Sequence, residues 1–382
     1  MSAVDSVLLI AFGGPTAPGE IRPFLERVAR GRPIPPERLE EVAHHYAAMP
    51  GGRSPLNALT ERQAVALGSA LAREGPALPV FVGMRNWRPF LHETLAEMTA
   101  RGHRRALGVI LSPFRCEASW DRYMEDVARG REAAPDAPEV VYAPPWFGHP
   151  RFVAAVADRA ARALAGVPAE RRAWAPLVFT AHSVPVAMAD ASPYVADLTT
   201  AASAVAAAVG HSRRSLAYQS RSGGPREAWL EPDVGDVLRR LGADGERDVV
   251  VVPIGFVCDH VEVLYDLDVE ARAVATAAGV TLHRAAAVND HPEFIAMLAD
   301  VVRRAAGGEP GEGAEISRAG GAGLPPATTL STPRGVPASS ARLRRPPEAT
   351  GLGEHPRPAG PVSSARPGRP PDIARTRRRE SP

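Results

Sequence analysis

The first 306 residues alternate short apolar runs with amphipathic stretches of helical period. Residues 6–12 (SVLLIAF) form one such run, and similar runs at 107–111, 177–181 and 248–254 are each followed by a turn and a helical pattern. Runs of consecutive apolar residues are typical of strands buried on both faces, and their alternation with helices is typical of βαβ units. The pattern therefore predicts an α/β fold with parallel sheets.

The predicted elements fall into two similar units. The first has strands at 6–12, 80–83, 107–111 and 140–143, with helices at 21–28, 37–49, 60–73, 89–101 and 120–130. The second has strands at 177–181, 216–219, 248–254 and 280–283, with helices at 151–165, 196–209, 233–241, 261–278 and 292–304. Segments 101–114 and 241–256 also share one order of helix end, glycine turn, strand, proline and aromatic residue. We therefore expect two facing domains, at 1–150 and 151–306, with a ligand cleft at the carboxyl ends of their strands.

The C-terminal tail differs in composition from the rest of the chain. Residues 307–382 carry 12 Arg against 7 acidic residues, whereas residues 1–306 carry 33 Arg against 36 acidic residues. The tail is rich in Gly and Pro and has no aromatic residue. Such a composition cannot bury enough apolar surface to offset chain entropy. We expect a disordered tail at 307–382 and no nucleic-acid site.

Composition and missing motifs narrow the function classes. All 45 basic residues are Arg, so the lysine of a phosphate-binding P-loop is absent, and no G-x-G-x-x-G turn occurs. Two cysteines, Cys116 and Cys258, are too few for a disulfide framework or for the four ligands of a structural zinc or an iron–sulfur cluster. The longest apolar run, 249–258, is about half as long as a membrane-spanning helix, and the N-terminus has no secretory signal pattern. We expect a cytoplasmic protein without stable membrane insertion.

One candidate site lies where a predicted strand ends. Residues 177–181 run directly into His182, and Pro185 stops the strand, which places His182 at the strand exit. A neutral imidazole there can accept a proton or coordinate a metal, although a histidine that only hydrogen-bonds within its loop fits equally well. A Ser-His-Asp hydrolase is disfavoured, because no G-x-S-x-G turn occurs and the adjacent Ser183 cannot easily face His182 in triad geometry.

A second candidate site follows the strand at 248–254. In a helix that starts near Asp259, the acidic residues Glu262, Asp266 and Glu270 recur every four positions and share one face. Three carboxylates in a row repel one another unless cations or protons use them. The alternative is a capping box with Asp259 as N-cap and Glu262 three residues later, and the pattern leaves both interpretations open.

Several separated segments resemble the ferrochelatases, which insert ferrous iron into a porphyrin. They are LLIAFGGP with GGRSPLNALT, VGMRNWRPF, FTAHSVP, YQSRSGGPREAWLEPDV and VPIGFVCDHVEVLYDLD, in the order and spacing of that family over residues 5–305. The resemblance implies two similar Rossmann-like, chelatase-type domains with the porphyrin in the cleft between them. This agrees with the two units expected from the pattern.

The resemblance also implies roles for individual residues. The metal-handling histidine and glutamate of the family fall on His182 and Glu262, and its metal or proton route falls on Asp266 and Glu270. Because metalation removes two pyrrole protons while a dication enters, a base and a carboxylate suit the reaction. The positions implied to bind porphyrin are Phe12, Arg30, His45, Tyr46, Ser54, Tyr123 and Trp229.

Three departures from the family pattern qualify these expectations. Phe12 stands where some relatives have Tyr and offers no oxygen to iron, and Asn86 stands where some have His. The tail has none of the cysteines of cluster-containing relatives, so we expect no cofactor and no iron–sulfur cluster. The substrates expected are ferrous iron and either protoporphyrin IX, with two propionates, or coproporphyrin III, with four. We expect the enzyme to be a monomer. A cobalt or nickel chelatase of another tetrapyrrole and a non-enzymatic porphyrin or haem carrier are the alternatives.

Overall fold

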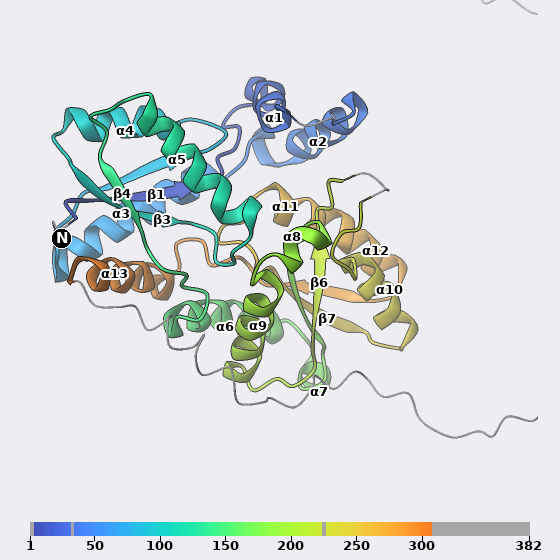
Figure 1. Cartoon of the computed structure of the whole chain (residues 1–382). Coiled ribbons are helices and arrows are strands. Elements are labelled where there is room, and N and C mark those ends of the chain that lie inside the picture. The colour runs from blue at the N-terminus through green and yellow to red at the C-terminus, as the bar shows by residue number, and fades with distance from the viewer. Residues whose placement is uncertain (1–3, 32–33, 224–226, 308–382) are drawn as a thin grey trace, which may run out of the picture. The chain divides into compact units, whose positions relative to one another are not determined.

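Two parallel sheets of four strands organise the part of the chain that the computed structural model describes, residues 4–31, 34–223 and 227–307. The strand order is β2-β1-β3-β4 in the first sheet and β6-β5-β7-β8 in the second (Figure 1). Both orders follow the same series of crossovers, so one topology occurs twice. The predicted α/β fold of two similar halves is confirmed.

The strands lie close to the predicted apolar runs. The first sheet contains β1 (Ser6–Ala11), β2 (Val80–Met84), β3 (Arg105–Ile110) and β4 (Glu139–Tyr142). The second contains β5 (Leu177–His182), β6 (Arg214–Gln219), β7 (Asp248–Val252) and β8 (Thr281–Arg284). Every residue of β1 and β7 is buried, because helices cover both faces of a parallel sheet. Burial on both faces explains why these strands are apolar at consecutive positions.

The helices follow the predicted alternation with the strands. The first half contains α1 (Ile21–Ala29), α2 (Pro36–Ala48), α3 (Leu56–Glu74), α4 (Leu91–Ala100) and α5 (Arg122–Glu132). The second contains α6 (Pro150–Ala165), α7 (Ala169–Arg172), α8 (Val186–Asp190), α9 (Tyr194–Ala208), α10 (Val234–Ala243), α11 (Val261–Leu264), α12 (Arg272–Ala277) and α13 (Pro292–Gly307). Shorter turns are the 3-10 segments η1 (Pro18–Glu20) and η2 (Pro50–Gly52) and the π-helical segments η3 (Glu117–Asp121) and η4 (Asp266–Ala271).

The single helix predicted at 261–278 is wrong in one respect. The chain there forms α11, then the π-helical segment η4, then α12. A π turn contains about one residue more than an α turn, so side chains four apart no longer stack directly. The apolar spacing of this stretch fits both turn types, which is why the pattern predicts a regular helix.

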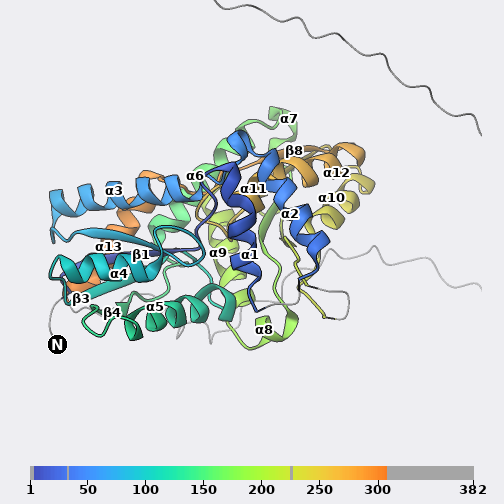
Figure 2. The same cartoon turned by 90° about the horizontal axis from the view of Figure 1, so that it is seen from above.

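Helix packing joins the two halves through one core. The last helix, α13, packs against α3 of the first half and α6 of the second (Figure 2). The largest apolar cluster includes Leu67 of α3, Phe179 of β5 and Phe294 of α13, all fully buried. This shared core fixes the position of one sheet relative to the other. The boundary between the two domains at residue 150 stays a prediction.

From residue 308 onward, the predicted disordered tail lies outside the described residues. Within the described ranges, no helix combines the length and the apolar character that a membrane crossing requires.

Gly255, which follows β7, has no Cβ atom and so allows the backbone there to lie close to the end of β5, next to His182. Its amide donates to the carbonyl of Thr180 at 3.0 Å, and a Cβ atom on it would lie 2.6 Å from the Cα of Ala181. We predict that Gly255→Ala lowers the free energy of unfolding by about 1–3 kcal/mol, because the strand backbone must move. Urea unfolding measures this.

The control for this prediction is Gly68→Ala within α3. A Cβ there would meet its nearest neighbour, Val80, at 3.9 Å, an ordinary contact. Alanine in a helix interior is expected to add up to about 1 kcal/mol. Equal stability of Gly255→Ala and the wild type would contradict the steric argument.

Candidate functional site

A cavity of about 1640 Å³ lies at the carboxyl ends of strands from both sheets. Its lining includes Phe12 after β1, Ser112 after β3, His182 at the end of β5 and Gly255 after β7. Both sheets reverse their strand order at these strands, between β1 and β3 and between β5 and β7. Open α/β sheets bind ligands at this point, so the fold places the cavity where the sequence predicts a cleft.

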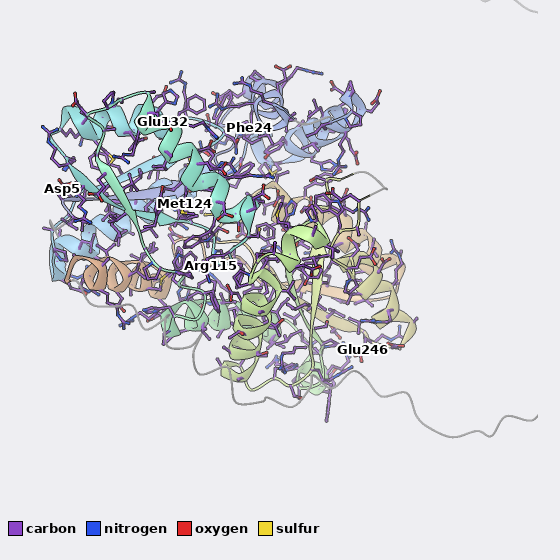
Figure 3. The ribbon with its side chains drawn as sticks, in the orientation of Figure 1. Asp5, Phe24, Arg115, Met124, Glu132 and Glu246 are labelled. Carbon is purple, nitrogen blue, oxygen red and sulfur yellow. The ribbon has the colours of Figure 1, made fainter. Side chains whose placement is uncertain are left out.

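The walls of the cavity come from helices and loops of both halves. Phe24 on α1 and Arg115 on the loop after β3 are two of the lining residues and are labelled in Figure 3. Phe24 belongs to an apolar cluster that also contains Tyr46 of α2 and Val261 of α11. Helices α1 and α2 of the first half therefore pack against the segment of the second half that carries the acidic residues.

His182 and Glu262 lie close to each other in the cavity lining. The Nε2 atom of His182 lies 3.7 Å from Oε1 of Glu262, and each side chain is 31% exposed. The Nδ1 atom of His182 contacts the carbonyl oxygen of Ser183, so Nδ1 carries the hydrogen and Nε2 keeps its lone pair in the neutral ring. Metal bonds to nitrogen and oxygen are about 2 Å long, so one ion can contact both atoms.

Neighbouring groups fix the main chain on both sides of this pair. The hydroxyl of buried Tyr194 donates to the carbonyl of His182 at 2.9 Å, and the amide of Glu262 donates to Nδ1 of His260 at 3.2 Å. His260 is therefore the N-cap of α11. Burial lowers the pKa of His260, which keeps its ring neutral and able to accept.

The capping box with Asp259 as N-cap is wrong. The carboxylate of Asp259 accepts instead from Arg284 at 2.8 Å and from the side-chain amide of Asn289 at 2.7 Å. These long-range partners draw Asp259 away from the helix start, and His260 takes the capping position. The side chain of Glu262 is consequently left to face His182.

Asp266 and Glu270 extend the acidic row along the cavity, although η4 breaks the regular helix between them. The pKa of Asp266 is raised to about 8, chiefly by burial and also by the nearby carboxylates of Glu262 and Glu270, against the hydroxyl of Ser220, which donates to it. Burial also raises the pKa of Glu270. Asp266 can therefore exchange a proton near neutral pH.

Six of the seven predicted porphyrin positions line the cavity. They are Phe12, His45, Tyr46, Ser54, Tyr123 and Trp229. His45 stacks on Tyr265 with ring centroids 3.8 Å apart, and its Nε2 lies 3.9 Å from Oε1 of Glu270, so it adjoins the acidic row as well. Phe12 remains 37% exposed in the cavity lining, so its ring is accessible there.

Two buried tyrosines in this set keep their hydroxyl protons at neutral pH. Burial raises the pKa of Tyr46 above its usual value, and the charges of Glu262 and Asp266 add to that effect. Burial likewise raises the pKa of Tyr123 to about 12, against the guanidinium of Arg85, which lies 4.8 Å from its ring centroid. Both hydroxyls can therefore donate hydrogen bonds to a substrate.

Arg30, the seventh position, does not line the cavity. It is exposed at the C-cap of α1, where the chain leaves the helix and turns at Gly31 with a φ of 76°. Ala29, one residue earlier, does line the cavity.

Five arginines line the cavity that sequence reasoning did not single out, because Arg is abundant throughout the chain. They are Arg38, Arg85, Arg115, Arg122 and Arg221. Arg38, Arg85 and Arg122 pair with Glu41, Asp126 and Glu117, and Arg221 donates to the carbonyl of Glu227. The structure shows no ion pair or hydrogen bond of the Arg115 guanidinium within the described ranges, so it adds an available positive charge.

The remaining metal-binding side chains do not gather into a larger cluster. Across the described residues, no three His, Cys, Asp or Glu side chains are placed to hold a metal ion together. Cys116 and Cys258 are both free and buried in the cavity lining, and burial raises the pKa of Cys258 to about 12. The arrangement thus offers a two-residue contact to a metal, in a large cavity lined by charged and aromatic side chains.

Comparison with known proteins gives consistent matches over the two halves. Residues 4–306 match the family model described as ferrochelatase. A coproporphyrin III ferrochelatase of Mycolicibacterium smegmatis is 47% identical over 302 residues, which cover 78% of this chain and 88% of that protein. A coproporphyrin III ferrochelatase of Nocardia farcinica is 41% identical over 357 residues, 89% of this chain and 100% of that protein. Among solved structures, SirB from Bacillus subtilis with Fe3+ has a TM-score of 0.50 at 12% identity over 79% of this chain and 95% of SirB, a likeness of fold alone.

The raised pKa of Asp266 predicts a specific dependence of stability on pH. The carboxyl of Asp266 has a pKa of about 4 in the unfolded chain and about 8 in the folded protein. Between these pH values the folded state binds more protons at Asp266 than the unfolded state does. The contribution of Asp266 to the free energy of unfolding therefore falls as pH rises. Asp266→Asn mimics the protonated form, so its advantage over the wild type should grow with pH, by at most about 1.4 kcal/mol per pH unit.

Urea unfolding of both proteins with a chelator present, at about pH 5 and about pH 8, measures the difference. Asp236→Asn, at an exposed carboxylate on α10, is the control and should show no such trend. The same stability difference between Asp266→Asn and wild type at both pH values would contradict the assignment.

Proposed function

The chain belongs to the ferrochelatase family of lyases in haem biosynthesis, and we propose that it inserts ferrous iron into coproporphyrin III. The observation that carries the proposal is the pair of His182 and Glu262, 3.7 Å apart at the edge of a cavity of about 1640 Å³. A base beside a carboxylate suits a reaction in which a dication replaces two protons.

The identity of the porphyrin rests on two kinds of support. Relatives named coproporphyrin III ferrochelatase are 41–48% identical to this chain over the aligned residues. The cavity also contains five arginines, and a guanidinium is the natural bidentate partner of a carboxylate. The lining also carries eight carboxyl side chains, so the support comes from the individual guanidinium groups and not from a net positive charge. Coproporphyrin III carries four propionates, whereas protoporphyrin IX carries two, and more guanidinium groups find a partner on the former.

The proposed reaction is balanced without oxidation or reduction. The free porphyrin loses two pyrrole hydrogens as protons, and ferrous iron forms bonds to the four nitrogens. Nε2 of His182 accepts a proton or holds the incoming ion, while the carboxylate of Glu262 offsets its positive charge. Asp266, with a pKa of about 8, holds a proton near neutral pH, passes it along the row toward Glu270 and takes up a released proton in its place.

The aromatic lining gives the macrocycle its apolar surfaces. We propose that Phe12 and Trp229 contact the ring, and that His45, Tyr46, Ser54 and Tyr123 bind its polar edge. Arg30 is proposed only as a contact at the mouth, since it lies outside the lining.

We further propose that the enzyme contains no iron–sulfur cluster. The whole sequence has two cysteines, and cluster ligation by thiolates takes four. The cytoplasmic location and the monomeric state stay predictions.

Parallel assays on two porphyrins test the proposed function most simply. Under anaerobic conditions, the wild type is given ferrous iron with coproporphyrin III or protoporphyrin IX, and the metalloporphyrin is followed by its absorbance. We predict a kcat/KM for coproporphyrin III at least about tenfold higher, because each charge-assisted hydrogen bond to a propionate contributes about 1.5–3 kcal/mol.

Equal or better use of protoporphyrin IX would overturn the substrate proposal. Cobalt and nickel with coproporphyrin III serve as metal controls, and faster insertion of either would favour a chelatase for another metal. Tight porphyrin binding without insertion of any metal would indicate a carrier.

A further inference from the structure

Gln219, the last residue of β6, lies directly beside His182 in the second sheet. The register of β5 and β6 pairs His182 with Gln219, and the Gln219 side chain is almost completely buried at 1% exposure. The proposed reaction gives Gln219 no direct role, because an amide neither titrates nor binds iron well. Its position nevertheless brings it into contact with the main chain beside both members of the pair.

Hydrogen bonds connect Gln219 to both sides of the site. Its backbone carbonyl accepts from the amide of Ser183 at 2.7 Å, immediately after His182. Its side-chain Nε2 donates to the backbone carbonyl of Glu262. One residue thus ties the exit of β5 to the first turn of α11.

The first turn of α11 depends on support from outside the helix. The helix has four residues and leads into the π-helical segment η4, and so short a helix is not stable by itself. The cap from His260 holds the amide of Glu262, and Gln219 holds its carbonyl. Loss of the second contact leaves the backbone of Glu262 held by its cap on the amide side alone.

The chain direction after Gln219 is also tightly defined. Ser220 has a left-handed backbone with a φ of 62°, which is unfavourable for a residue with a side chain. Its hydroxyl contacts the carboxylate of Asp266. Two successive residues at the end of β6 therefore contact the acidic row, Gln219 at Glu262 and Ser220 at Asp266.

We infer that Gln219 is a positioning residue that sets the separation between Nε2 of His182 and Oε1 of Glu262. The inference rests on the proposed function, since it assigns Gln219 to the geometry of metal insertion. Its amide oxygen Oε1 is buried without a hydrogen-bond partner among the described residues. A buried amide with one unpaired atom is less favourable for stability than an apolar side chain of the same size. Stability therefore does not explain Gln219, and we assign its contribution to the geometry of the site.

Two variants of equal length test the inference. Gln219→Met removes the donor, and Gln219→Glu replaces it with an acceptor that repels the carbonyl of Glu262. For both we expect kcat for iron insertion to fall about tenfold or more, as for other supporting contacts of metal sites, while KM and Kd for coproporphyrin III change less than about twofold.

The matched control is Gln63→Met in α3. Gln63 is equally buried, its Nε2 donates to the carbonyl of Asn289 at 2.8 Å, and its Oε1 likewise has no partner in the described ranges. This variant should change thermal stability about as much as Gln219→Met does but keep kcat within about twofold of the wild type.

Each outcome decides the inference. A folded Gln219 variant with wild-type kcat would overturn it, as would an equal loss of kcat in Gln63→Met. If neither Gln219 variant folds while Gln63→Met does, the residue serves folding and the inference is wrong. Failure of the wild type to insert any iron would instead overturn the proposed function.

Discussion

The site depends on one constraint, the separation of an imidazole nitrogen and a carboxylate oxygen that both present lone pairs and therefore form no hydrogen bond with each other. His182 and Glu262 stand 3.7 Å apart, beyond a normal hydrogen bond. The main chain keeps them there, because β5 ends at His182 and Tyr194 holds its carbonyl, while Glu262 is fixed in the first turn of α11. The gap between them is wide enough for an ion that contacts both.

The acidic row extends this constraint away from the pair. Asp266 and Glu270 line the same cavity from η4, whose wider turn replaces the regular helix. Mutual repulsion and burial keep a proton on Asp266 near neutral pH. A row of carboxylates that are not all charged at once can accept protons released at the pair and lead them toward His45 and Glu270, which lie 3.9 Å apart.

The sequence was sufficient for features that depend on local patterns. The shared order of elements at 101–114 and 241–256 predicted two similar halves, and Pro185 after an apolar run located His182 at a strand exit. The π-helical segment escaped prediction because its apolar spacing also fits an α-helix. The bond from Gln219 to Glu262, and the bonds from Arg284 and Asn289 that hold Asp259 away from the capping position, join residues far apart in the chain, which no local pattern encodes.

The central claim is that His182 and Glu262 act on one metal ion as a unit, and a double-mutant cycle tests it directly. kcat/KM for iron insertion is measured for the wild type, His182→Ala, Glu262→Gln and the double variant, with His44→Ala at an exposed position on α2 as control. The account predicts that each single change costs about 100-fold or more and that the double variant is no slower than the slower single variant, within about threefold. Losses that multiply in the double variant, or single variants as fast as the wild type, would contradict it.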